Sequence, residues 1–473
     1  MFKTIEFDGY IDHNKITIFS QSKESHSMNT FDLRCIFRCK KPRRSQRLEI
    51  KDISEVKSQT VQQGALGFLE LVPLELKFLI FSYLPVEDLS QLTITSKCLR
   101  NLVELYRNSG RYQKFLIPQP VVHSAPINKI FEHTELCNHF KKLGLLVKRS
   151  TCLYSTKERL KLMHQFLRKY HCSNQEICCD PTRCVSLLCF GRFLHTVLAG
   201  WDDHECIKAF DVITQSSGMM KNLHNLLNAK PGAYSDLELR TRLFFRRVFI
   251  GQHERGADRA FWLHLILKAF PMVHQARVLF LLFGPISSDK IQWYEMSERT
   301  PVSKEEALLC FSDLANAFRV LHCYSKDWTE DTIISVIDEV TSGPDDWLSE
   351  NMAHLLFLCG DRITTKVLCS KAINGRVNEL CDMVPSLCLI CCRHEQPMSW
   401  VINVVRRVAM VMENPKERLQ FLHGIVDMFR DILISIHYLV ETDDNAHEFQ
   451  LMLEAQGAFT KEIILMGFKD IVT

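Results

Sequence analysis

Glycine is scarce in this chain, which contains 18 glycines among 473 residues. Strand signals are nearly absent after residue 60, where apolar residues recur at helical spacing instead of alternating. Few glycines and a helical period together favour an all-α protein over any fold built on a sheet.

Long apolar runs are also missing. The run Val278–Phe283 stops at Gly284, far short of the roughly 20 residues that a bilayer requires. The first residues, Met1–Asp8, lack a long apolar core and carry acids early, so we expect no secretory signal peptide. The chain has 19 cysteines, an odd count, and several lie in apolar helical patterns, such as Cys310 and Cys388. They are predicted to be reduced, buried thiols of a nuclear or cytosolic protein.

Motifs of catalysis are absent as well. The sequence has no glycine-rich phosphate loop, no His-Glu-x-x-His and no Gly-x-Ser-x-Gly, so we expect no active site and no cofactor. Histidine and cysteine gather twice, but with irregular spacing that matches no Cys-x2-Cys knuckle, so no metal site is predicted. The two groups are His164, His171, Cys172, Cys178, Cys179, Cys184, Cys189 and His195, and Cys381, Cys388, Cys391, Cys392 and His394. The alternative to a chain without an active site is a cysteine nucleophile activated by a neighbouring histidine, but no motif in the sequence pairs a particular cysteine with a particular histidine.

The net charge of the chain is small, and positive charge is concentrated near the N-terminus. The net charge is +3, yet residues 1–60 hold twelve Lys/Arg and eight Asp/Glu, which leaves the rest of the chain at −1. Residues 1–60 also lack a sustained apolar period. They are predicted to form a mostly disordered basic N-terminal segment.

Within that segment, Arg34–Arg47 carries seven positive charges and no acid. One interpretation is a solvated basic tail. The other is a nuclear import signal made of Lys40, Lys41, Arg43 and Arg44, which predicts a nuclear protein that also occurs in the cytoplasm. Phe37 is the one aromatic residue in this stretch, and none is interleaved through the charges after it, which disfavours direct contact with DNA or RNA.

Helix start signals recur from residue 68 onward. Ser155 with Glu158 reads as a capping box, and Ser303 repeats the pattern. Thr329 is predicted to cap a further helix, and Pro344 to open another. Helices of this length joined by short breaks predict an α-solenoid-like or irregular helical array over residues 109–473, without a fixed repeat period.

Three short amphipathic segments lie within residues 72–106. Pro73 opens the first, Pro85 breaks it, and Thr95 and Ser96 cap the third. They are too small to bury a core alone. Their apolar residues therefore predict a surface that a partner covers.

These segments resemble the F-box, the module that binds a Skp-type adaptor and, through it, cullin and RING subunits. The resemblance places the module at residues 66–108. Val72 stands where leucine is usual, and Leu99 where a tryptophan is common; both are apolar. By the resemblance, the adaptor-binding residues are Val72, Pro73, Leu74, Leu76, Ile80, Leu84, Pro85 and Leu89.

A similarity to one branch of the F-box family continues from about residue 68 to the C-terminus. It rests on the segments Leu143–Arg149, Thr156–Lys161, Ala199–Asp202, Ala260–Leu263, Pro271–Val273, Gln275–Arg277, Phe283–Ser287 and Lys371–Arg376. The resemblance implies a non-catalytic receptor of an SCF-type ubiquitin ligase, with relatives linked to chromosome maintenance in meiotic prophase. The substrate is then expected to be nuclear. The alternative is a non-degradative scaffold for chromosomal or telomeric proteins, with the adaptor as a stabilising subunit. A nucleic-acid-binding helical repeat is disfavoured by the near-neutral body.

The electropositive stretch Arg240–Arg247 is the candidate for substrate binding. An acidic or phosphorylated motif could be bound by the guanidinium groups of Arg242, Arg246 and Arg247, which form paired hydrogen bonds with carboxylates and phosphates. The alternative is an ordinary helix with its apolar residues inward and its arginines outward.

Overall fold

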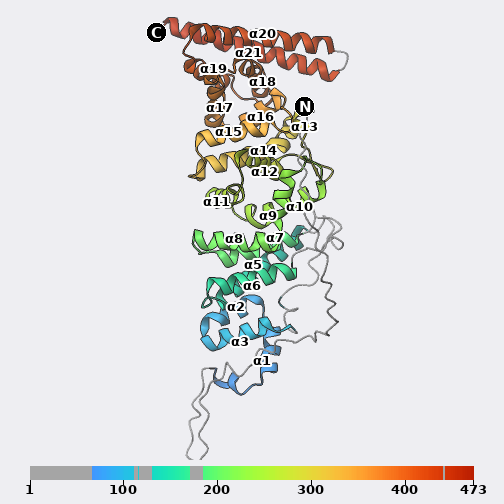
Figure 1. Cartoon of the computed structure of the whole chain (residues 1–473), viewed down its shortest axis with the longest axis vertical. Helices are drawn as coiled ribbons and strands as arrows, with labels where there is room; N and C mark the ends of the chain where they lie inside the picture. Colours follow the sequence, from blue (N-terminus) through green and yellow to red (C-terminus); the bar gives the residue numbers. More distant parts are fainter. Residues whose placement is uncertain (1–65, 111–115, 117–129, 171–184, 440–442, 473) are drawn as a thin grey trace, which may run out of the picture. The chain divides into compact units, whose positions relative to one another are not determined.

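The computed structural model describes residues 66–110, 116, 130–170, 185–439 and 443–472 (Figure 1). The predicted basic segment 1–60, with its candidate import signal, lies outside these residues. The described part is helical apart from one short antiparallel pair, β1 (Ile286–Ser287) and β2 (Lys290–Ile291). The prediction of an all-α fold is therefore confirmed.

The helices fall into a short N-terminal group and a long array. The first group is the 3-10 helix η2 (Gly67–Glu70), α1 (Leu74–Ser82), α2 (Val86–Thr95) and α3 (Lys97–Asn108). The array begins with α5 (Ile130–Ser150), α6 (Thr156–Tyr170), α7 (Ser186–Leu198), α8 (Asp203–Ser216), α9 (Met219–Asn228), α10 (Ser235–Phe245), the π-helix η4 (Arg246–Ile250), α11 (Gly256–Leu267) and α12 (Met272–Phe283). It continues with α13 (Glu295–Glu298), α14 (Lys304–Tyr324), α15 (Glu330–Ser342), α16 (Ser349–Cys359), α17 (Asp361–Ile373), α18 (Val377–Arg393), α19 (Ser399–Val411), α20 (Pro415–Leu439) and α21 (Asp443–Val472).

The array is built as two rows of stacked helices. In one row α14, α16, α18 and α20 each pack on the next, and in the other α15, α17, α19 and α21 do the same (Figure 1). Packing between every second helix is the arrangement of stacked helical pairs, in which each pair buries its apolar face on its neighbours. One continuous apolar core joins these helices, from Phe78 in α1 to Phe459 in α21.

The predicted caps begin the helices that they mark. Glu158 N donates to Ser155 Oγ at 3.3 Å, and Ser155 N donates back to Glu158 Oε2 at 3.0 Å. Ser303 Oγ accepts from the amide of residue 306 at 3.2 Å, and Thr329 Oγ1 accepts from the amide of residue 332 at 3.2 Å. Each bond satisfies an amide that would otherwise lack a partner at a helix start.

The helix expected to open at Pro344 begins later, at Ser349. Here the prediction is wrong by about one turn. The amide of Trp347 donates to Thr341 O at 2.9 Å, and the amide of Leu348 donates to Met296 O at 3.0 Å. These two bonds hold the backbone in a loop until Leu348, and the sequence offers no local sign of the second, whose partners are 52 residues apart.

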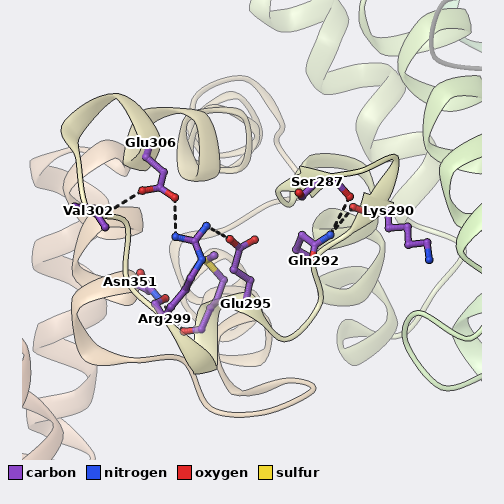
Figure 2. A network of polar contacts seen from close by, with 9 residues as sticks. Ser287, Lys290, Gln292, Glu295, Arg299, Val302, Glu306 and Asn351 are labelled. Atoms are coloured by element: carbon purple, nitrogen blue, oxygen red, sulfur yellow. Dashed lines mark hydrogen bonds and ion pairs between the residues drawn. The ribbon is translucent and has the colours of Figure 1, made fainter.

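The connection between α12 and α14 is fixed by a polar network centred on Arg299 (Figure 2). Its guanidinium pairs with Glu295 and, at 2.6 Å, with Glu306 Oε1. The buried Asn351 of α16 donates its Nδ2 hydrogens to Met296 O and Arg299 O, both at 2.8 Å. The connection is thereby tied to α14 and α16, so the start of the two stacked rows is held in place.

Candidate adaptor-binding site

The inward side of α1 rests on α3 through aromatic contacts. The rings of Phe78 and Phe81 meet Tyr106 edge to face, at centroid distances of 5.6 and 5.7 Å. All three side chains are buried, together with Leu89 of α2 and Val103 of α3. These contacts fix α1 in one orientation on α3.

The outward side of α1 is also apolar, and it is exposed. We call Leu76, Leu79, Ile80 and Tyr83 the α1 face; they are 50%, 45%, 45% and 81% exposed. A helix with apolar side chains all round is normally buried on every side. The α1 face therefore requires cover that the described part of the chain does not provide. Further exposed apolar residues nearby in the chain are Phe68, Leu69, Leu71 and Ile94.

Helix α2 joins this module to the array by packing on α5. Glu87 of α2 forms an ion pair with Lys142 of α5, and Lys142 lowers the pKa of the Glu87 carboxyl below its ordinary value. Nearby, Arg149 of α5 donates to Ser90 Oγ at 3.0 Å. Within α2 and α3, Ser96 Oγ accepts from the amide at the third position of α3 at 3.1 Å, as the sequence predicted.

The structure divides the predicted adaptor-binding residues into three groups. Leu76, Ile80, Pro73 and Pro85 are exposed, and Val72, Leu74 and Leu84 are half-buried. Leu89 is fully buried, so it cannot contact an adaptor in this structure, and we assign it to the support of α1 and α2.

The sequence prediction omitted Leu79 and Tyr83, which complete the α1 face. The available signal was their position: Leu76, Leu79, Ile80 and Tyr83 occupy positions i, i+3, i+4 and i+7, the spacing of one helix side. The sequence also places Phe78 and Phe81 on the opposite side of the same helix. It therefore indicates that both sides of α1 are apolar, but not which side packs on the core.

Comparison with known proteins then identifies the module and the family. The family described as "F-box domain" matches residues 69–108, and the one described as "FBXO47, ARM repeats" matches residues 215–463. F-box only protein 47 from Homo sapiens is 34% identical over 409 residues, covering 85% of this chain and 89% of the human protein. The chain belongs to the F-box only protein 47 family. The Mus musculus relative is 35% identical over 417 residues, covering 86% of this chain and 91% of its own length. No solved structure matches the chain.

The family assignment fits the two parts of the fold. The F-box match spans α1, α2 and α3 and so contains the whole α1 face. The repeat match begins near the end of α8 and runs into α21, so it covers both rows of stacked helices.

The basic stretch does not form a surface clamp. Arg242 is buried, its Nη1 donates to Leu281 O at 3.0 Å, and burial lowers its pKa to about 9. Arg246 pairs with Asp313 at 2.6 Å, and Arg247 is half-buried. The prediction that Arg242 binds substrate is therefore wrong, and Arg246 is already occupied by a carboxylate. Arg242 and Arg246 tie α10 and η4 to α12 and α14.

The second histidine-cysteine group lies in the core. Burial raises the pKa of Cys391 to about 12 and that of Cys388 well above its ordinary value, so both are neutral thiols at neutral pH. No group of His, Cys, Asp and Glu among the described residues is placed to hold a metal ion. Most of the first group lies in residues 171–184, outside the described part. Of the helices that the structure describes, none is long and apolar enough to span a bilayer.

Proposed function

We propose that this chain is the substrate-recognition subunit of an SCF-type ubiquitin ligase. The observation that supports this most is the α1 face: an exposed apolar side of a helix within the F-box match. A Skp-type adaptor that covers this face would link the chain to cullin and RING subunits. The chain would then act by proximity, holding its substrate at high effective concentration beside the conjugating enzyme.

Co-expression with the Skp-type adaptor tests this proposal. The intact chain is expected to co-purify with the adaptor at one-to-one stoichiometry, which can be measured from the mass of the complex. Recovery of the folded chain without bound adaptor, under conditions where a known F-box protein retains it, would contradict the proposal.

A finer proposal concerns location. We propose that the chain works in the nucleus on a chromosome-associated protein, with Lys40, Lys41, Arg43 and Arg44 as the import signal. A receptor shortens the half-life of its partner, whereas a scaffold leaves it unchanged. Measuring the half-lives of co-purifying nuclear proteins with and without the chain separates the two.

Replacing Lys40, Lys41, Arg43 and Arg44 with alanine is expected to move a fluorescent fusion of the full chain from the nucleus to the cytoplasm. Import receptors bind clustered positive charge, and these four changes remove most of it. Lys51 and Lys57 replaced with alanine serve as the control, with unchanged nuclear signal. Equal nuclear signal in all three proteins would refute the assignment of the import signal.

A further inference from the structure

The last helices of the array form a groove that the proposed function leaves without a role. It lies between α19, α20 and α21 and has a volume of about 270 Å³. Its floor is made of the buried Ile402 and Val405, and its walls include Met410, Leu422 and Ile463. The groove is therefore apolar and open to solvent.

The exposed surface of α19 and α20 is unusually apolar for the end of a stacked array. Met410 is 60% exposed, Leu419 58%, Val426 59% and Leu422 41%. Terminal repeats of such arrays ordinarily carry a polar outer face that keeps them soluble. A row of exposed apolar residues beside a groove marks an interaction surface instead.

Two arginines line this groove without a carboxylate. Arg418 donates its Nε hydrogen to Met412 O at 2.6 Å, which fixes the side chain and leaves its terminal nitrogens available. Neither Arg406 nor Arg418 has an ion-pair partner among the described residues. By contrast, Arg407 pairs with Asp361 at 3.1 Å and Arg430 with Asp427 at 2.9 Å. Within the described residues, the positive charge at the groove thus lacks a paired carboxylate, unlike the charges of Arg407 and Arg430 on the same helices.

We infer that this groove captures a short acidic segment of a partner protein, placing apolar side chains on Ile402 and Val405 and anionic groups on Arg406 and Arg418. The anions are carboxylates or phosphates, because both match the planar guanidinium. Since the captured segment would belong to the substrate, this inference rests on the proposed function and names its recognition chemistry.

Two other occupants fit less well. The groove is smaller than the roughly 300–1,000 Å³ of typical small-molecule sites, so it suits one or two side chains of a peptide better than a whole ligand. A second copy docked by two-fold symmetry would bring the same patch against itself. Arg406 and Arg418 of both copies would then face one another, and like charges in close contact disfavour that arrangement.

Selection from a displayed library of random 12-residue peptides on the intact chain–adaptor complex tests the inference. Enriched peptides are expected to combine Asp or Glu with Leu, Ile, Phe or Met. Binding of the best synthetic peptide is expected to fall at least tenfold in the variant Arg406→Glu with Arg418→Glu. Arg407→Glu with Arg430→Glu makes the same total change of charge on α19 and α20 outside the groove lining and is the matched control, with unchanged affinity.

Each outcome decides the inference. No enrichment, enrichment of basic peptides, or equal affinity in the double variant and the wild type would overturn it. So would a concentration-dependent rise in mass with no peptide bound, which would identify a second copy as the occupant. A synthetic peptide with phosphoserine in place of glutamate distinguishes the two anions by its affinity. Adaptor retention in the same samples reports on the proposed function separately, since the groove variants leave the α1 face intact.

Discussion

The double substitution Leu76→Asp with Ile80→Asp is expected to weaken adaptor binding more than 100-fold. Both side chains are about half exposed on the outward side of α1, where an adaptor would bury them. Losing each apolar anchor costs about 2 kcal/mol, and each new carboxylate would be buried without a partner. A 100-fold loss corresponds to only about 2.7 kcal/mol, so the expected effect exceeds it. Titration calorimetry of the purified chain with the adaptor measures the change.

Leu309→Asp provides the control for this substitution. Leu309 is 83% exposed on α14, so it places the same charge on an apolar site away from α1. We expect its adaptor affinity to match the wild type, and all three proteins to unfold at similar temperatures. An affinity of the double variant within a few-fold of the wild type would remove the α1 face from the adaptor interface.

Acidification below pH 6.5 is expected to destabilise the array through His195. Burial is the main cause that lowers the pKa of His195 to about 3, with His253 adding to it. The neutral ring donates its Nε2 hydrogen to Val248 O at 2.8 Å and lies 5.1 Å from the ring of Trp262. Between pH 6.5 and 3 the unfolded chain binds a proton that the folded chain does not, so stability falls as the pH falls. If the pKa shift acted in full, the free energy of unfolding would fall by about 2 kcal/mol between pH 7 and pH 5. Because His195 keeps some contact with solvent, we expect a smaller fall, of at least about 1 kcal/mol.

Urea unfolding of the wild type and His195→Gln at pH 7 and pH 5 measures this loss. The variant removes the titrating ring, so the drop in unfolding free energy between the two pH values is expected to shrink by about 1 kcal/mol or more. His204→Gln changes an exposed histidine of α8 and is expected to leave the drop unchanged. An identical drop in His195→Gln and the wild type would show that His195 does not carry the pH dependence.

The starts of the helices could be predicted from the sequence because they are set by residues at the helix ends themselves. Pro73, Pro85 and Ser96 begin α1, α2 and α3 as predicted, since proline suits a first helical turn and the serine hydroxyl caps an open amide. Helical spacing likewise identified the long array. These signals act within one or two turns of helix, and at these three positions no tertiary contact overrides them, whereas the bond from Leu348 to Met296 O does so after Pro344.

Which side chains are buried depends on tertiary contacts, and the spacing of residues in the sequence does not reveal these contacts. Leu76 and Leu89 look alike in the sequence, yet one is half exposed and the other fully buried, because the core of α3 and α5 lies on one side only. Arg242 looks like a surface charge, and only the carbonyl of Leu281, 39 residues later, explains why it is buried. The groove at Arg406 could not be predicted for the same reason: it exists only once three consecutive helices, α19, α20 and α21, have packed together, and spacing does not tell how they pack.

Hydrogen–deuterium exchange of the chain, alone and saturated with the Skp-type adaptor, tests the role of the α1 face most directly. It needs no substitution, so no folding defect can imitate its result. Slowed exchange on adaptor binding is predicted for peptides covering η2, α1 and α2, residues 67–95, with α14 to α21 unchanged. Unchanged exchange across residues 67–95 in the bound complex, with protection elsewhere in the array, would contradict the account.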